Sequence, residues 1–239
     1  MFGELHGNYE SPTFFGAAVS SALSATNMNV LVGLELPVAM QATIDTYLRS
    51  SGDPESREAL LQHSFWHRQM QDGKSSAAMF DLLEHFRQLG ARYSGRLLVR
   101  AIDGVRADQQ QPSTGSDRDA ILARNATDDA ANNSDGVSLF LVGNFHSRRQ
   151  PLNGLDYIRP MASLLQVPFI SVQIVPNGGT SWNCQAGCGD NSVMQFVPGL
   201  EALANYQNDG EYDYVVDLGP VTSAEPAIWA SVALETVSD

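Results

Sequence analysis

The stretch Val30-Leu31-Val32-Gly33-Leu34-Glu35-Leu36-Pro37 decides the fold of this chain. Its first five residues are apolar or glycine without a break, a pattern typical of a parallel strand buried on both faces. Glu35 comes at the end of this run, and Pro37 opens a predicted helix. A second run of the same character covers residues 137–142 and leads into Gly143-Asn144-Phe145-His146. Both runs therefore indicate the centre of a mostly parallel sheet.

Helices and strands are expected to alternate along the rest of the chain. Besides the helix opened by Pro37, apolar residues at helical spacing predict helices over residues 12–25, 54–62, 75–89, 117–131 and 161–166, with Asp117 as a cap. Further strands are predicted over 96–102, 169–175 and 214–217. This order predicts an α/β fold, a Rossmann-like, mostly parallel sheet flanked by helices. Its N-terminal strand would be truncated, because only Met1 and Phe2 precede Gly3.

We expect two parts in the 239 residues: an α/β domain over 1–175, and a C-terminal extension over 176–239 that packs on the sheet edge. The extension would begin with a glycine-rich loop that carries Cys184 and Cys188, the two cysteines of the chain. Two thiols this close favour a small disulfide loop over free thiols. Metal binding at the pair comes third, because a zinc site needs about four ligands.

The charge balance limits the class of partner. With 14 basic and 27 acidic residues the formal charge is −13, and no basic run is present, so nucleic acid is excluded as a partner. No apolar run approaches the roughly 20 residues of a transmembrane helix. A small molecule or a peptide is the expected ligand, and the pattern specifies no oligomeric state.

Polar residues follow several of the predicted strands. Ligands of open α/β sheets bind beyond the carboxyl ends of the strands. Glu4 and His6 would follow the first strand, Glu35 the second and His146 the run at 137–142, while Asp103 closes another. Imidazoles and carboxylates meeting at one edge can run acid–base chemistry or bind a divalent metal. The candidate metal ligands are His6, Glu35 and His146.

Other polar residues receive structural interpretations. His63 and His67 lie four apart and could share a helix face, but they are better explained as cover for Phe65 and Trp66. His85 lies opposite the apolar stripe of its helix, which predicts exposure without a role. The segment Gln71-Asp72-Gly73-Lys74-Ser75-Ser76 lacks the first glycine of a phosphate loop and predicts a turn and helix cap. From its spacing alone, we expect Arg118 to form a salt bridge. The alternative is that its guanidinium binds a carboxylate or phosphate group of a ligand.

Four motifs in order resemble those of the ChaN-like family: Gly3-Glu4-Leu5-His6-Gly7, Gly33-Leu34-Glu35-Leu36-Pro37, Arg118-Asp119 and Gly143-Asn144-Phe145-His146. The family belongs to the superfamily that joins ChaN haem-uptake lipoproteins, erythromycin esterases and Tiki/TraB metalloproteases, and the resemblance suggests a bacterial source for this chain. The resemblance spans about residues 1–175. It implies a Rossmann-like domain with a polar cleft.

The resemblance assigns roles to the residues that match its motifs. Catalytic or binding roles fall on Glu4, His6, Glu35, Arg118 and His146. The esterase-like branch implies a hydrolase in which histidine and glutamate activate water, and the Tiki-like branch implies a metal held by histidines. The ChaN branch implies the alternative, a haem-binding protein of iron uptake, although no haem ligand can be matched to a residue here. Divalent metal and haem are thus the two cofactors the resemblance suggests.

The compartment is likewise an expectation. The family resemblance and the expected disulfide together favour export as part of a longer precursor, to the periplasm or to a membrane anchor. No leader opens the present sequence, and a cytoplasmic location stays open.

Overall fold

The computed structural model describes residues 1–109, 118–152, 158–195 and 210–229. In chain order the elements are β1 (Phe2–Glu4), α1 (Glu10–Ala25), β2 (Val30–Pro37), η1 (Val38–Met40), α2 (Gln41–Leu48), α3 (Pro54–Leu61), α4 (Ala77–Arg92), β3 (Leu97–Asp103), α5 (Arg118–Asn132), β4 (Val137–Gly143), η2 (Met161–Leu164), β5 (Val172–Cys184), β6 (Cys188–Ser192) and β7 (Tyr214–Val221). Here η marks a 3-10 helix. The predicted fold class, a Rossmann-like α/β arrangement, is confirmed.

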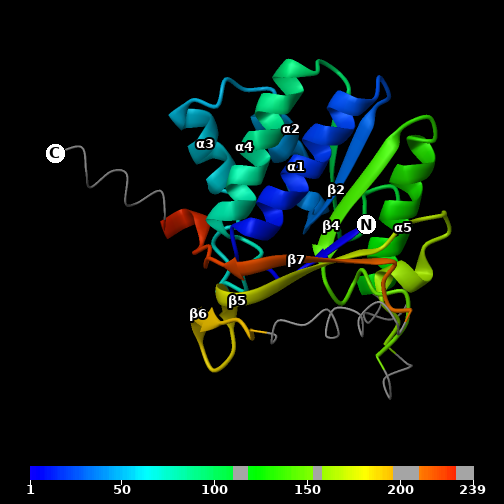
Figure 1. The fold of residues 1–239 in the computed structure, drawn as a ribbon. Helices are drawn as coiled ribbons and strands as arrows, with labels where there is room; N and C mark the ends of the chain where they lie inside the picture. Colours follow the sequence, from blue (N-terminus) through cyan, green and yellow to red (C-terminus); the bar gives the residue numbers. More distant parts are fainter. Residues whose placement is uncertain (110–117, 153–157, 196–209, 230–239) are drawn as a thin grey trace.

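One sheet organises these elements. Its strand order is β3-β2-β4-β1-β5-β6, and β7 pairs with β5 (Figure 1). Every pair is parallel except β5 with β6, which is antiparallel. The first strand is short, as expected, yet it lies inside the sheet. Its residue Phe2 is opposite Leu141 of β4 on one side and Val172 of β5 on the other.

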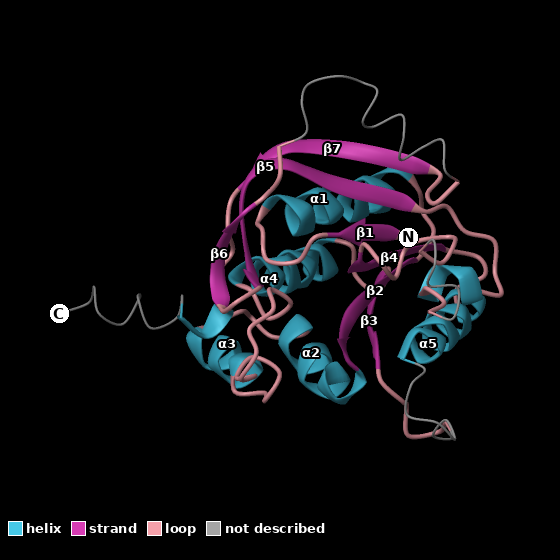
Figure 2. Ribbon diagram, turned by 90° about the horizontal axis from the view of Figure 1, so that it is seen from below, coloured by secondary structure: helices cyan, strands magenta, loops and turns pink. Residues whose placement is uncertain are grey.

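Helices cover both faces of the sheet: α1 to α4 lie on one face and α5 on the other (Figure 2). Side chains of β2 alternate between the two layers, because successive residues of a strand point to opposite faces. Val30, Val32 and Leu34 pack in the core under α1 and α4, whereas Leu31 packs in the core under α5. Gly33 would also point to the α5 side, and a Cβ there would lie 2.1 Å from the Phe140 ring.

The predicted helices of the first 132 residues are present as α1 to α5 with small differences at the ends, whereas the helix predicted over residues 161–166 is the 3-10 helix η2 (Met161–Leu164). After Pro37 the chain forms the 3-10 turn η1 before α2 begins at Gln41, so the proline opens a turn and not a regular helix. Helix α4 begins after Ser76, whose hydroxyl accepts the backbone N–H of Met79, as a helix cap should. The predicted cap Asp117 lies outside the described residues.

The C-terminal part differs from the expected glycine-rich loop. Strand β5 continues to Cys184 and forms a hairpin with β6, closed by a disulfide between Cys184 and Cys188. Gly178 and Gly179, both at positive φ, take up irregularities in the pairing with β7, so the strand passes through its glycines. The preferred disulfide is thereby confirmed. The predicted boundary between the α/β domain and the C-terminal extension, at residues 175 and 176, falls inside strand β5. The division into two parts stays a prediction.

No helix in the described part of the chain is both long and apolar enough to cross a lipid bilayer. Export of a longer precursor stays a prediction.

Candidate functional site

The structure brings all five predicted site residues to one edge of the sheet. In the strand order β3-β2-β4-β1, each carboxyl end supplies a polar residue to the same place. These are Asp103 from β3, Glu35 from β2, His146 just after β4, and Glu4 with His6 from the end of β1. Arg118, the first described residue of α5, reaches this edge from the α5 face.

Glu4 and His6 form the first of two carboxylate–imidazole pairs. His6 Nδ1 donates to Glu4 Oε1 at 2.9 Å, which leaves the lone pair on Nε2. Burial raises the pKa of Glu4, and the contact with His6 works against that rise. Burial lowers the pKa of His6, but the hydrogen bond to Glu4 and the charges of Glu35 and Glu4 outweigh it and raise the pKa above its ordinary value.

Glu35 is the buried anion at the centre, with 4% of its side chain exposed. Its Oε2 accepts the backbone N–H of Gly143 at 2.6 Å, and its Oε1 accepts from Arg118 Nη2 at 2.5 Å. Lys74 Nζ lies 3.5 Å from the same Oε1. Burial raises the pKa of Glu35, but the nearby charges of His6, His146, Arg118 and Lys74 outweigh it and hold the pKa far below its usual range. Glu35 is therefore a fixed negative charge.

Arg118 joins three strand ends. Its Nε and Nη2 donate to the two carboxylate oxygens of Asp103 at 3.0 and 2.7 Å, and its Nη1 donates to His146 Nε2 at 2.8 Å. Burial lowers its pKa, but Asp103 and Glu35 more than offset that and raise it. With 41% of the side chain exposed, Arg118 also faces solvent. The salt bridge that the spacing predicts is confirmed, and Arg118 forms it with two carboxylates, those of Glu35 and Asp103.

His146 and Asp119 form the second carboxylate–imidazole pair. His146 Nδ1 donates to Asp119 Oδ1 at 2.6 Å, and the same oxygen accepts the backbone N–H of Met161 at 2.7 Å. This tautomer places the lone pair of His146 on Nε2, where Arg118 donates to it. Asp119 is absent from the predicted site set, although it stands directly after Arg118 in the motif. An acidic residue next to a site arginine was the signal that could have identified it.

Gly143 forms the floor between the two pairs. A Cβ at this position would lie 3.0 Å from His6 Nε2, 3.4 Å from Glu35 Oε2 and 3.5 Å from His146 Cδ2. The absence of a side chain at Gly143 therefore lets three functional side chains lie close to the backbone, as expected for a glycine at a strand end.

The predicted metal ligands His6, Glu35 and His146 do not fit a divalent metal in this arrangement. Both oxygens of Glu35 already accept N–H donors, and the Nε2 of His146 accepts from Arg118. A guanidinium thus occupies the space between two of the three ligands. Among the described residues, no group of three or more His, Cys, Asp or Glu is placed to hold a metal. The haem alternative rests on the family resemblance alone.

The remaining histidines lie away from this edge. Helix α3 ends at Leu61, so His63 and His67 do not share a helix face; both lie in the turns that follow, beside the buried Phe65 and Trp66. The prediction that His85 is exposed is wrong, and its lack of a functional role stays a prediction. His85 is partly buried and its Nε2 lies 2.9 Å from the hydroxyl of Ser20, because α4 turns this side chain onto α1.

Lys74 is the second residue that the sequence prediction missed. Its segment does form the expected turn before the cap Ser76, but the turn also delivers the ammonium to Glu35. A signal was present in the composition, because Lys74 is the single lysine of the chain.

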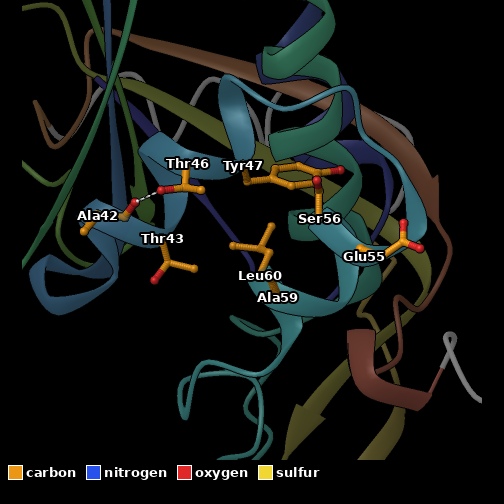
Figure 3. Close-up of a pocket in the computed structure, with 8 residues that line it drawn as sticks. All are labelled: Ala42, Thr43, Thr46, Tyr47, Glu55, Ser56, Ala59 and Leu60. Atoms are coloured by element: carbon orange, nitrogen blue, oxygen red, sulfur yellow. Dashed lines mark hydrogen bonds between the residues drawn. The ribbon is translucent and has the colours of Figure 1, made fainter.

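A pocket of about 530 Å³ lies elsewhere, between α2 and α3 (Figure 3). It is lined by Ala42, Thr43, Thr46, Tyr47, Glu55, Ser56, Ala59 and Leu60. The hydroxyl of Thr46 donates to the backbone of its own helix, and Tyr47 donates to Glu84. The pocket includes none of the predicted site residues.

Comparison with known proteins identifies the fold. No protein-family model and no curated protein matches the chain. Among solved structures, a protein from Bacillus cereus matches with a TM-score of 0.60 at 11% identity, covering 94% of this chain and 89% of its own. A succinoglycan biosynthesis protein matches with a TM-score of 0.63 at 10% identity, covering 93% and 88%. A mutant of the erythromycin esterase EreC, in its open conformation, matches with a TM-score of 0.60 at 12% identity, covering 85% and 78%. The chain therefore shares its fold with an erythromycin esterase.

Proposed function

We propose that this protein is a hydrolase in which His6 activates water for attack on an ester or a related carbonyl compound. The observation that carries the proposal is the contrast at Nε2. His6 Nε2 has no hydrogen bond to any described residue, and Glu35 Oε2 lies 3.7 Å from it. His146 Nε2, in comparison, already accepts from Arg118. The lone pair of His6 is thus the one that can take a proton.

The first half of the reaction is the attack of water. His6 Nε2 takes a proton from a water molecule, whose oxygen attacks the carbonyl carbon, and the carbonyl electrons move onto their oxygen. Glu4 holds the imidazole in the required tautomer and stabilises the imidazolium that forms. With 20% of its side chain exposed, His6 is in contact with solvent, the source of the water.

The second half is the departure of the alcohol. When the bond to the leaving oxygen breaks, the His6 imidazolium returns its proton to that oxygen, so that one water is consumed for each ester cleaved. Arg118 is suited to bind an acceptor group of the substrate, because four N–H···acceptor contacts fix its guanidinium while the side chain stays partly exposed.

Two further points support the proposal. The chain shares its fold with a protein named as an erythromycin esterase. Its four ordered motifs also resemble those of the superfamily that contains such esterases, and we propose membership of that superfamily. A small-molecule or peptide ligand suits the proposal, and we leave the substrate unassigned within that class.

The test is hydrolysis of a panel of esters, including nitrophenyl esters and macrolide lactones, by the wild type and His6→Ala. We expect the wild type to hydrolyse at least one member and His6→Ala to lose about 10²–10⁴-fold in kcat/KM, the usual contribution of positioned acid–base catalysis. His67→Ala is the matched control, since this exposed imidazole lies away from the site. Full activity of His6→Ala on a responsive ester would contradict the proposal.

A further inference from the structure

Lys74 carries an ammonium that is enclosed but weakly bound. Only 17% of its side chain is exposed, and it forms ion pairs with Glu35 Oε1 at 3.5 Å and Asp72 Oδ2 at 3.7 Å. Charge-assisted N–H···O bonds are normally about 2.7–2.9 Å long, and an ammonium has three donors to place. Among the described residues, Glu35 is the only one that accepts a hydrogen bond from Nζ. The ammonium therefore keeps donor capacity at the site.

The turn that carries Lys74 is fixed on both sides. Before it, the Gln71 side chain donates to the backbone oxygens of Trp66 and Arg68, and Trp182 Nε1 donates to the backbone oxygen of Gln71. After it, the backbone oxygen of Ser75 accepts the N–H of Ala227. Local contacts of Gln71 and two contacts from distant residues, Trp182 and Ala227, therefore hold the turn in place.

A contact between two glycines sets the distance from this turn to His6. Gly7 and Gly73 both have positive φ, at +80° and +91°. A Cβ on Gly73 would lie 2.8 Å from Gly7 N and 2.5 Å from the backbone oxygen of Trp182, and a Cβ on Gly7 would lie 1.8 Å from that same oxygen. Since these glycines directly follow His6 and directly precede Lys74, their packing fixes the two functional residues relative to each other.

Both side chains then converge on one carboxylate. His6 Nε2 lies 3.7 Å from Glu35 Oε2, and Lys74 Nζ lies 3.5 Å from Glu35 Oε1. A base and a positive charge beside one another are the two groups that carbonyl hydrolysis requires, one for the attacking water and the other for the oxygen that becomes negative.

We infer that Lys74 is a further catalytic residue, whose ammonium binds the carbonyl oxygen of the substrate and the negative charge that develops on it. This inference rests on the proposed hydrolase function. In the step described above, the carbonyl electrons move onto an oxygen that Lys74 contacts through an N–H, and they return to re-form the carbonyl when the alcohol leaves. The lysine donates a hydrogen bond and keeps its proton throughout.

The kinetic test compares Lys74→Met, Lys74→Arg and the control Arg92→Met on an ester that the wild type cleaves. Arg92 is the last residue of α4, the helix that Lys74 precedes, and it is exposed. We expect Lys74→Met to lose about 10²–10³-fold in kcat with little change in KM, the effect of removing one oxyanion donor. Lys74→Arg should recover part of the loss because it keeps the charge. Wild-type kcat in Lys74→Met, beside an inactive His6→Ala, would overturn the inference and leave the proposed function standing.

A second measurement does not depend on activity. Reductive methylation with ¹³C-formaldehyde labels Lys74 as the only lysine, together with the amino terminus, and Lys74→Arg assigns the signal. We expect methylphosphonate, a tetrahedral anion, to shift the Lys74 resonance in a saturable way at constant ionic strength. A resonance that stays in place up to the solubility limit of the probe would overturn the inference. If no ester is cleaved, the proposed function fails, and this titration alone decides whether Lys74 binds an oxyanion.

Discussion

The site contains two imidazoles, and a carboxylate holds each of them through Nδ1. The two rings differ in the hydrogen-bond partner of Nε2. In the Glu4–His6 pair, Nε2 has no hydrogen-bonding partner among the described residues and faces Glu35 at 3.7 Å. In the Asp119–His146 pair, Nε2 accepts from Arg118 at 2.8 Å. The same pair of side-chain types therefore supplies a base in one place and a support for a cation in the other. The chemistry of a histidine depends on its second nitrogen as much as on its first.

The largest expected effect separates the two histidines by activity. His6→Ala should lose about 10²–10⁴-fold in kcat/KM, because it removes the proton acceptor. His146→Ala should lose less, about fivefold, because it removes one of several bonds that hold Arg118 and each such bond contributes roughly 1 kcal/mol. Kinetics of both variants, with thermal unfolding followed by circular dichroism, make the comparison. Equal losses in the two variants would contradict the division of roles.

The next effect concerns the cation that caps the second pair. Arg118→Met should lower the free energy of unfolding by about 1–3 kcal/mol, because the buried charge of Glu35 loses its closest partner. Partial exposure of Arg118 to water keeps this figure moderate. Urea unfolding measures it, with Arg92→Met as the control.

The double variant Arg118→Met/Glu35→Gln sharpens this result. It should recover part of the stability, because the buried charge is then removed together with its partner. A double variant that is less stable than Arg118→Met would show that the ion pair does not carry the loss.

The third effect is a displaced pH profile. Because His6 must be neutral to accept a proton and its pKa is raised, activity should fall as the pH drops through that raised pKa. Glu4→Gln replaces the anionic acceptor of Nδ1 with a neutral amide, which should lower the pKa of His6 and move this acid limb to lower pH. The profile of kcat/KM against pH is the measurement, and Asp119→Asn should leave the limb in place. A limb that moves to higher pH in Glu4→Gln would refute the assignment of His6.

The smallest effect belongs to the carboxylate of the second pair. Asp119→Asn should cost about 1 kcal/mol of stability, the usual contribution of one partly buried hydrogen bond. It should also relax the tautomer of His146, since Nδ1 loses its anionic acceptor. Nitrogen-15 chemical shifts of the imidazole report the tautomer directly. An unchanged tautomer population would mean that Arg118 alone fixes this ring.

Much of the fold follows from short apolar runs. Residues 30–34 alternate between two packed layers and so needed apolar side chains on both faces, which made β2 easy to recognise. The C-terminal hairpin was harder to predict, because Gly178 and Gly179 have the composition of a loop although their positive φ angles only displace the pairing of β5. Glycine marks an irregular backbone and does not specify whether the strand ends there.

The site was predictable where a strand end carries the residue. Glu4, Glu35 and His146 follow apolar runs, so the topology brings them together. Lys74 has no such marker, because its position depends on the packing of Gly73 against Gly7 and on a carbonyl more than a hundred residues further along the chain. Contacts of this kind have no local pattern in the sequence.

The place of β1 in the sheet has a consequence for folding. Its residue Phe2 pairs with Leu141 and Val172, so both partner strands of β1 lie far along the chain from it. Domains form from the N-terminus during synthesis, and contacts between distant segments form slowly. We therefore expect β2, β3 and α4 to associate first and β1 to be inserted near the end. Since His6 follows β1 directly, the proposed base would reach its position in one of the last steps, and intermediates lacking that step would be inactive.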